Sequence, residues 1–155
     1  MSRAASIESL VERYIDERTN LRQLVKGSAR NHRCTLMSFT QSLDGKAVRQ
    51  LTDVDVETWL SARHKLAAAT RRHNLSTVRS FCDWLVRRGY LRTNPTVELA
   101  PVKVPRYLPR ALPAPKVAKL LEAAPDRRGV LMCLLMVQEG LRCAEVSGVQ
   151  VGDID

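Results

Sequence analysis

AATRRHNLSTVRSFCDWLVRR, residues 68–88, is the stretch that decides the fold of this chain. At 100° per residue its apolar side chains fall on one arc and most of its basic side chains on another, which is the pattern of an amphipathic helix. Gly89 follows as a C-terminal stop, and Asn94-Pro95 closes the unit. The stretch therefore predicts a long helix from Ala68 to Arg88 with a basic outer face.

The sequence before this stretch predicts three further helices and no strand, because apolar residues recur every three or four positions. The first begins after Ser6, a suitable N-cap, and ends near Asn20. The second runs from Ser28 to about Ser42, and the third from Thr52 or Asp53 to near His64. Residues 1–95 are thus expected to form an all-α, four-helix domain, with Trp59, Phe81 and Trp84 mainly in its core.

The sequence after this stretch changes character, because six of the seven prolines lie between Pro95 and Pro115. Such a segment continues neither a helix nor a central strand, so residues 96–113 are predicted to be a linker. Its basic residues Lys103 and Arg106 could follow a phosphate backbone. Residues 114–155 then predict short helices at 115–124 and 142–148, with a buried helix at 128–138 between them.

Charge favours a polyanionic partner. The chain carries 25 Lys and Arg against 16 Asp and Glu, a net charge of +9 and a pI near 9.9. Residues 1–100 hold 17 basic and 10 acidic residues, and eight of these basic residues lie between Arg63 and Arg92 against the single Asp83. A solvated face is the usual role of such a run, but this imbalance favours a nucleic-acid contact surface.

The four cysteines show no CxxC spacing, and no clustered ligands or phosphate-cradling glycine loop occur, so neither a metal nor a cofactor is expected. No N-terminal signal pattern is present. The longest apolar run, residues 130–137, is shorter than the roughly 20 residues that span a bilayer. The expected location is therefore the cytoplasm of a bacterium or of a phage-infected one, and no membrane partner is expected.

Two segments resemble the tyrosine recombinase family of phage integrases and chromosome-dimer resolving recombinases. Residues 139–155, EGLRCAEVSGVQVGDID, resemble the first catalytic box of the family, a Gly-Leu-Arg-x-x-Glu-Leu pattern that continues toward Asp-Ile, with Val146 where leucine is common. Residues 70–95 are similar to the last helix of the core-binding domain of the family. The resemblance implies a SAM-like four-helix core-binding domain, a linker, and the helical start of an incomplete catalytic domain.

The resemblance implies a catalytic role for Arg142. In the family reaction a tyrosine attacks a DNA phosphodiester and forms a 3′-phosphotyrosyl link, while arginines stabilise the charge on the phosphate. A guanidinium suits this role because it stays charged and donates two parallel hydrogen bonds. Glu145, three residues on, would orient Arg142. The alternatives are an ordinary surface arginine and a solvated i,i+3 pair.

The resemblance also implies that the second and fourth helices enter adjacent grooves of double-stranded DNA. The expected contacts carried over from the family are Arg30, Asn31, Thr70, His73, Thr77 and Arg79. Arg72 joins them because it lies on the same basic helical face. An isolated histidine such as His73 is more often a simple surface residue. Self-association on DNA is expected of the full-length protein.

The other family boxes have no match, and Tyr14, Tyr90 and Tyr107 all precede Arg142, so none is in the order of the nucleophile. The chain is therefore expected to bind DNA within site-specific recombination or integration, without cutting it and without an additional N-terminal arm-binding domain. A non-catalytic DNA-binding regulator or recombination accessory protein remains an alternative. A basic helical bundle that binds protein is another, and it predicts no salt-dependent duplex binding.

Overall fold

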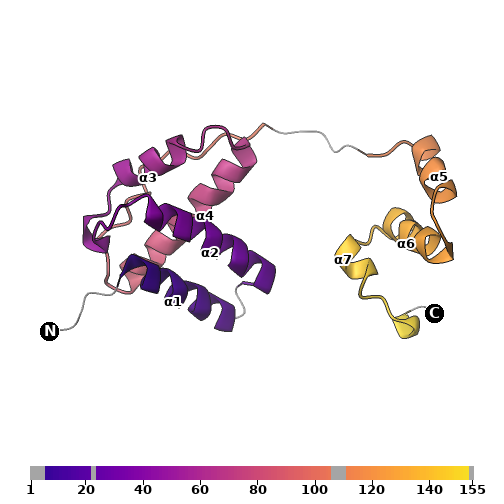
Figure 1. Ribbon diagram of the computed structural model, residues 1–155, viewed down its shortest axis with the longest axis horizontal. Coiled ribbons are helices and arrows are strands. Elements are labelled where there is room, and N and C mark those ends of the chain that lie inside the picture. Colours follow the sequence, from indigo (N-terminus) through magenta and orange to yellow (C-terminus); the bar gives the residue numbers. More distant parts are fainter. Residues whose placement is uncertain (1–5, 22–23, 106–110, 154–155) are drawn as a thin grey trace. The chain divides into compact units, whose positions relative to one another are not determined.

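The computed structural model describes residues 6–21, 24–105 and 111–153, and these segments contain helices and no strand (Figure 1). The chain divides into two compact units, Met1–Arg106 and Tyr107–Asp155. The first holds the α-helices α1 Ile7–Asn20, α2 Lys26–Gln41, α3 Asp53–Ser61 and α4 Ala68–Arg87, with a short 3-10 helix at Val48–Gln50. The second holds α5 Ala114–Glu122, α6 Arg127–Gln138 and α7 Cys143–Val146, with a 3-10 helix at Val151–Asp153.

Local capping explains where the helices of the first unit begin and end. Ser6 Oγ accepts a hydrogen bond of 3.3 Å from Ser9 N, which caps α1 as predicted. Asp55 Oδ2 accepts from the backbone N of Thr52 at 2.8 Å and so reaches back over the first turn of α3. Gly89, with φ of 74°, follows α4 in the left-handed conformation that glycine adopts without strain.

The core of the first unit is built from the apolar faces of its four helices. Tyr14 of α1 packs edge-on against Phe81 and Trp84 of α4, with ring centroids 5.4 and 5.8 Å apart. A second edge-on pair, Phe39 and Trp59 at 5.3 Å, joins α2 to α3. Trp59, Phe81 and Trp84 are all buried, so their predicted place in the core is confirmed.

The predicted helices are all present, with differences at their ends. The second begins at Lys26, two residues before its predicted start, and the third ends at Ser61, before a series of turns over residues 62–66. The last predicted helix, 142–148, is limited to the single turn of α7. Helix ends fray and are governed by few interactions, so periodicity locates them less well than it locates helix centres.

The prediction of a buried helix at 128–138 was wrong. No residue of α6 is buried, and Leu131 and Val137 are each 48% exposed. The second unit contains three short helices, and within its described residues these cover one another only in part. The apolar sequence indicates which side chains of α6 favour burial. It does not indicate whether the other described residues of the second unit cover them.

The proline-rich segment packs against the first unit over its first residues, although the linker was predicted to begin at residue 96. The Thr96 side chain is fully buried, and Leu99 belongs to the core. Val102 packs against that core, whereas its neighbour Lys103 is exposed. Pro105 is the last residue described before the gap at 106–110.

Candidate nucleic-acid interface

Helices α2 and α4 pack against each other in the first unit, and polar side chains from both helices meet at this contact. The rings of His32 and His73 meet edge-on with centroids 5.7 Å apart. Beside them, Thr35 Oγ1 lies 3.4 Å from Asn74 Oδ1. Figure 1 shows that the N-terminal ends of α2 and α4 lie at the same end of the unit. The contact therefore presents residues from the first half of each helix on one surface.

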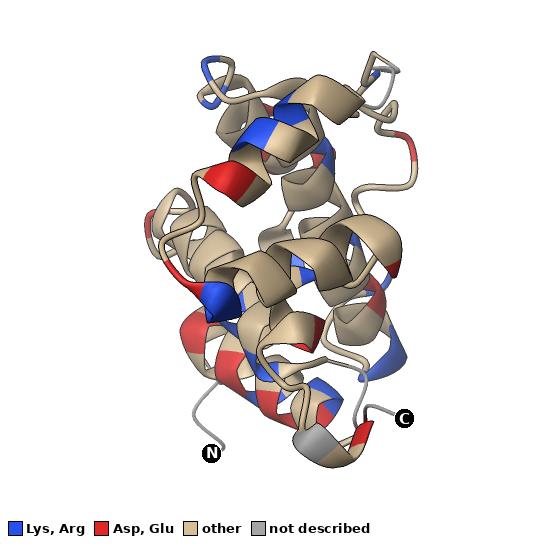
Figure 2. Cartoon of the chain, turned by 90° about the vertical axis from the view of Figure 1, so that its right-hand side faces the viewer, with Lys and Arg blue, Asp and Glu red and all other residues tan. Residues whose placement is uncertain are grey.

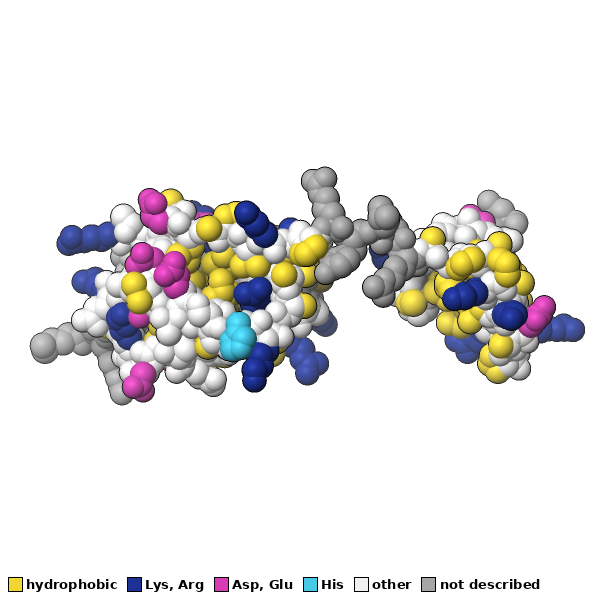
Figure 3. All heavy atoms as spheres, turned by 90° about the horizontal axis from the view of Figure 1, so that it is seen from above, with side chains coloured by type: hydrophobic (Ala, Val, Ile, Leu, Met, Phe, Trp, Pro, Cys, Tyr) yellow, Lys and Arg dark blue, Asp and Glu magenta, His cyan; other side chains and the backbone are white. Residues whose placement is uncertain are grey.

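Five of the predicted DNA contacts lie in the first halves of α2 and α4 with exposed side chains. They form what we call the α2–α4 face: Arg30, Asn31, Thr70, Arg72 and His73. The right-hand half of the first unit in Figure 3 shows Lys, Arg and His side chains with no acidic side chain in view, whereas the left-hand half mixes both signs. The face therefore combines positive charge with hydrogen-bonding groups, which suits a phosphate backbone and base edges.

The arginines of the first unit divide into those with intramolecular partners and those without. Arg33 donates from Nε to both carboxylate oxygens of Glu12, at 3.0 and 2.9 Å. Arg63 lies over the Trp59 ring, 4.3 Å from its centroid, and also donates to Ser38. Arg30 and Arg72, by contrast, form no ion pair with any residue that the structure describes. Their guanidinium groups are available to an external anion.

Thr77 and Arg79 do not belong to the α2–α4 face. The Thr77 side chain is 2% exposed, because α4 packs against α1, α2 and α3 and so buries a wide arc of its surface. Arg79 is partly buried, and its Nη2 donates to the carbonyl oxygens of Thr96 and Leu99, each at 3.0 Å. Of the two linker residues, Lys103 is exposed and Arg106 lies outside the described residues.

Three exposed residues beside this face had not been predicted as contacts. Lys26 begins α2, Lys65 precedes α4, and Ser76 follows Arg72 by four residues, on the same side of α4. The helical period alone could have indicated Ser76, since residues i and i+4 share a face. Lys26 lies in α2 only because that helix begins two residues before its predicted start.

His32, whose ring contacts that of His73, has a lowered pKa. Burial lowers the pKa of His32, and the nearby His73 and Arg18 lower it further. His32 is thus held neutral to lower pH than an ordinary histidine. His73 is the exposed member of the pair and is the one placed to meet a ligand.

Arg142 lies at the start of α7, after the turn at Gly140, whose φ is 69°. Its Nη1 donates to Glu145 Oε1 at 3.0 Å, and its backbone N donates to Glu145 Oε2 at 2.7 Å. The Arg142 side chain is 84% exposed. Glu145 therefore restrains both the backbone and the guanidinium of Arg142 while leaving most of the side chain open to solvent.

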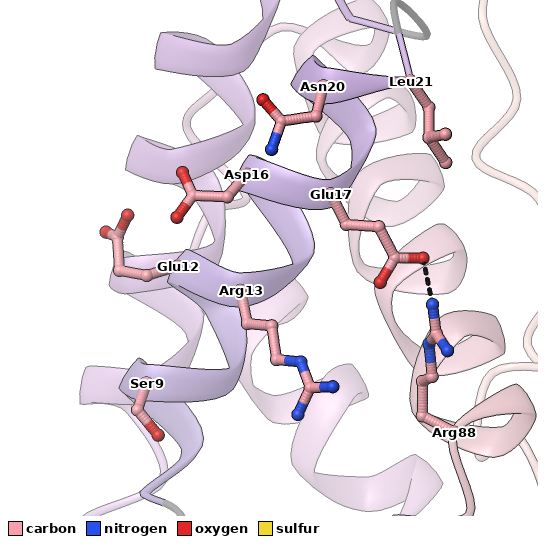
Figure 4. Close-up of a pocket in the computed structure, with 8 residues that line it drawn as sticks. All are labelled: Ser9, Glu12, Arg13, Asp16, Glu17, Asn20, Leu21 and Arg88. Carbon is pink, nitrogen blue, oxygen red and sulfur yellow. Dashed lines mark hydrogen bonds and ion pairs between the residues drawn. The ribbon is translucent and has the colours of Figure 1, made fainter.

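A shallow hollow on α1 is lined by three carboxylates together with Arg13 and Arg88 (Figure 4). Its carboxylates come from Glu12, Asp16 and Glu17, and Figure 2 shows such acidic residues gathered near the N-terminus. Glu17 of α1 accepts from Trp84 Nε1 of α4 and pairs with Arg88, the residue that follows α4, so it joins the two helices.

Within residues 6–21, 24–105 and 111–153, no group of three His, Cys, Asp or Glu side chains is arranged to hold a metal ion. All four cysteines are free thiols. The described helices include none that is both long and apolar enough to cross a membrane.

Fold and surface together define a helical domain with one basic, open face. The model of the family described as "Phage integrase, N-terminal SAM-like domain" matches residues 11–89. The chain belongs to this family, that of the phage integrases and tyrosine recombinases. The predicted family and the predicted all-α, SAM-like fold are therefore confirmed.

Curated relatives include the tyrosine recombinases XerC of Neisseria meningitidis serogroup C (strain 053442) and of Haemophilus ducreyi. The first is 36% identical over 95 residues, which are 57% of this chain and 31% of the relative. The second is 31% identical over 134 residues, which are 81% of this chain and 44% of the relative. The chain thus spans less than half the length of these relatives.

Two solved structures have a similar fold. A lambda integrase, solved as a dimer bound to a COC′ core site, matches with a TM-score of 0.80 and 19% identity over 97% of this chain and 56% of its own. The integrase from mycobacterium phage Brujita matches with a TM-score of 0.59 and 22% identity over 86% of this chain and 46% of its own. At these identities the likeness concerns the fold.

Proposed function

We propose that the first unit binds double-stranded DNA through the α2–α4 face, as the DNA-gripping front half of a tyrosine recombinase that performs site-specific recombination or integration. The observation that carries the proposal is the position of Arg30 and Arg72 on two helices that pack against each other, both exposed and both without an ion-pair partner among the described residues. An arginine without an intramolecular ion-pair partner can bind a phosphate without first breaking an ion pair. Its contact with DNA therefore costs less free energy.

The side chains of the α2–α4 face suit different parts of a DNA duplex. Arginine side chains bind phosphate oxygens and guanine edges, and an asparagine such as Asn31 can pair with an adenine edge. Thr70 and His73 add hydrogen-bonding groups on α4. The lambda integrase with this fold was solved as a dimer on a DNA core site. The proposal therefore includes double-stranded DNA of core-site type as the partner and self-association on that DNA. It also includes a location in the bacterial cytoplasm.

In the second unit we propose that Arg142 is the first of the arginines that stabilise the phosphate during strand cleavage and that Glu145 positions it. The two hydrogen bonds from Arg142 to Glu145 support this assignment, because they limit the directions in which the guanidinium can point. Electrostatic stabilisation of a developing charge requires donors that are already in place.

The domain boundaries belong to the same proposal. Residues 1–95 would form the core-binding domain, the basic residues Lys103 and Arg106 would follow the DNA backbone, and residues 114–155 would begin the catalytic domain. The division of the structure into the units Met1–Arg106 and Tyr107–Asp155 supports two domains. It also favours a first domain that includes the packed residues Thr96 and Leu99.

The experiment is a gel shift of the chain with labelled duplexes that carry candidate core sites, repeated with an Arg30→Ala, Arg72→Ala double variant. Arg87→Ala is the matched control, because Arg87 is exposed on α4 about 22 Å along the helix from Arg72. The proposal predicts a shift that is weakened by the double variant and nearly unchanged by the control. No shift with any duplex would contradict it.

A further inference from the structure

The segment after α4 is attached to that helix by one arginine. Arg79 Nη2 donates to Thr96 O and to Leu99 O, both at 3.0 Å, and its Nε lies 3.4 Å from Thr96 Oγ1. These bonds link residues 17 and 20 positions apart in sequence. The guanidinium of Arg79 is therefore occupied within the protein and does not face outward as the basic residues of the α2–α4 face do.

A side-chain turn completes the attachment. Asn94 Oδ1 accepts from the backbone N and from the Oγ1 of Thr96, each at 2.8 Å, and Asn94 Nδ2 donates to Asp83 Oδ1 at 2.6 Å. The Thr96 side chain is fully buried, and Leu99 lies in the core. The Arg79 clamp, defined here as Arg79, Asp83, Asn94, Thr96 and Leu99, thus holds the segment by polar bonds and by packing.

Arginine fits this position for a reason that lies in the segment itself. Residues 94–102 form no regular helix or strand, and within the segment Asn94 O and Thr96 O accept from Val97 N and Leu99 N at 3.4 and 3.3 Å. Arg79 adds a second donor to Thr96 O and supplies a donor to Leu99 O. Pro95 and Pro101 supply no backbone N–H. A planar guanidinium can donate to several carbonyl oxygens at once, which a lysine ammonium on a flexible stem does less well.

We infer that Arg79 is a positioning residue that fixes the point at which the chain leaves the first unit. With the clamp closed, the chain toward the second unit starts no earlier than Val102, which packs on the core. With the clamp open, residues 94–102 join the tether, and these nine residues add about 30 Å of reach. A longer tether lowers the effective concentration of one unit near the DNA that the other has bound.

The role on DNA rests on the proposed function, whereas the clamp itself does not. The first measurements therefore use the intact chain without DNA and compare the wild type with Arg79→Ala and Asn94→Ala. Arg72→Ala is the control, since it removes an exposed arginine from the same helix. Retention of helical circular dichroism shows that each variant is folded.

Two readouts test the clamp. Amide hydrogen exchange over residues 96–103 is expected to accelerate about tenfold or more in both clamp variants and to stay unchanged in Arg72→Ala. Dyes on the exposed Cys34 and Cys143, one in each unit, report the distribution of distances between the units in a Cys133→Ser background. This distribution should broaden in the clamp variants, a change that mere loss of stability in a folded protein would not produce.

Binding to a duplex long enough for both units gives the third readout. The clamp predicts weaker binding by Arg79→Ala with an unchanged salt dependence, because no phosphate contact is lost. A slope of log K against log salt that falls by about 0.9 would instead show a direct phosphate contact and overturn the inference.

Unchanged exchange and an unchanged distance distribution in Arg79→Ala would overturn it as well. If Arg79→Ala fails to fold, Asn94→Ala and Thr96→Val, which keep the arginine, decide the question by the same readouts. Failure of the wild-type chain to bind DNA would contradict the proposed function while leaving the two DNA-free readouts intact.

Discussion

Glu145 holds Arg142 at two points, with Oε1 3.0 Å from the guanidinium Nη1 and Oε2 2.7 Å from the backbone N. The same carboxylate thus caps the first turn of α7 and restrains the side chain. The bond from the Arg142 backbone N satisfies one of the N–H groups that a helix start leaves without an intrahelical partner.

This pair yields a prediction about strand cleavage in a full-length recombinase that contains this chain. Arg142→Ala is expected to bind DNA normally and to lose cleavage by about 10²–10³-fold, the usual cost of removing one stabilising donor. Glu145→Gln should cost less, about tenfold, because it keeps one acceptor oxygen and the arginine. Cleavage of a suicide substrate measures both, and cleavage by Arg142→Ala at the wild-type rate would refute the assignment.

Thr77 gives a prediction that separates the core from the DNA surface. Its hydroxyl oxygen is buried and has no hydrogen-bond partner among the described residues, and the side chain is 2% exposed. Thr77→Val has nearly the same shape and removes the unsatisfied group, so it should raise the free energy of unfolding by about 1 kcal/mol. Denaturant unfolding measures this change.

The same variant should leave DNA affinity unchanged, in contrast to the contact that the family resemblance implied for Thr77. Arg72→Ala is the comparison, since it removes an exposed side chain from the same helix. A loss of affinity in Thr77→Val as large as that in Arg72→Ala would restore Thr77 to the interface.

His32 predicts a pH dependence of stability. Its pKa is lowered in the folded chain, first by burial and then by His73 and Arg18, so the unfolded state binds more protons near neutral pH. This contribution to stability is present above the ordinary histidine pKa of about 6.5 and is lost as the pH falls toward the lower pKa of the folded state. The free energy of unfolding should therefore decrease on acidification through this range.

Unfolding of His32→Gln over the same pH range provides the test, because glutamine keeps a polar side chain that does not titrate. The variant is expected to show a shallower decrease between about pH 6.5 and 5. An identical pH profile for the variant and the wild type would show that another group causes the acid sensitivity.

The sequence predicted the fold of the first unit well, because the relevant signals are local. Ser6 precedes a regular apolar repeat, and the arc that holds Leu75, Val78 and Phe81 was visible from the helical period alone. Leu75, Val78 and Phe81 are indeed buried. Helix ends such as Lys26 were less accurate, since no side chain caps the start of α2 and the sequence carries no local signal for it.

The candidate site was predicted only in part, because the exposure of two predicted contacts depends on tertiary packing. Thr77 is polar and lies near the basic arc, yet three helices pack around α4 and bury it. Arg79 lies on the basic face in a helical projection, but the chain returns 17 residues later and occupies its guanidinium. The helical period of α4 does not show how wide an arc of the helix is buried. It also does not show that the segment after α4 folds back against the helix.

The central claim is that the α2–α4 face binds duplex DNA through unpaired arginines. The most direct measurement is the affinity of the chain for a core-site duplex as a function of salt, for the wild type and for the Arg30→Ala, Arg72→Ala double variant. We expect log K to fall linearly with log salt in the wild type. The double variant should bind roughly tenfold or more weakly, with a slope smaller by about 1.8, the loss of two phosphate contacts. An affinity and a slope equal to those of the wild type would contradict the account.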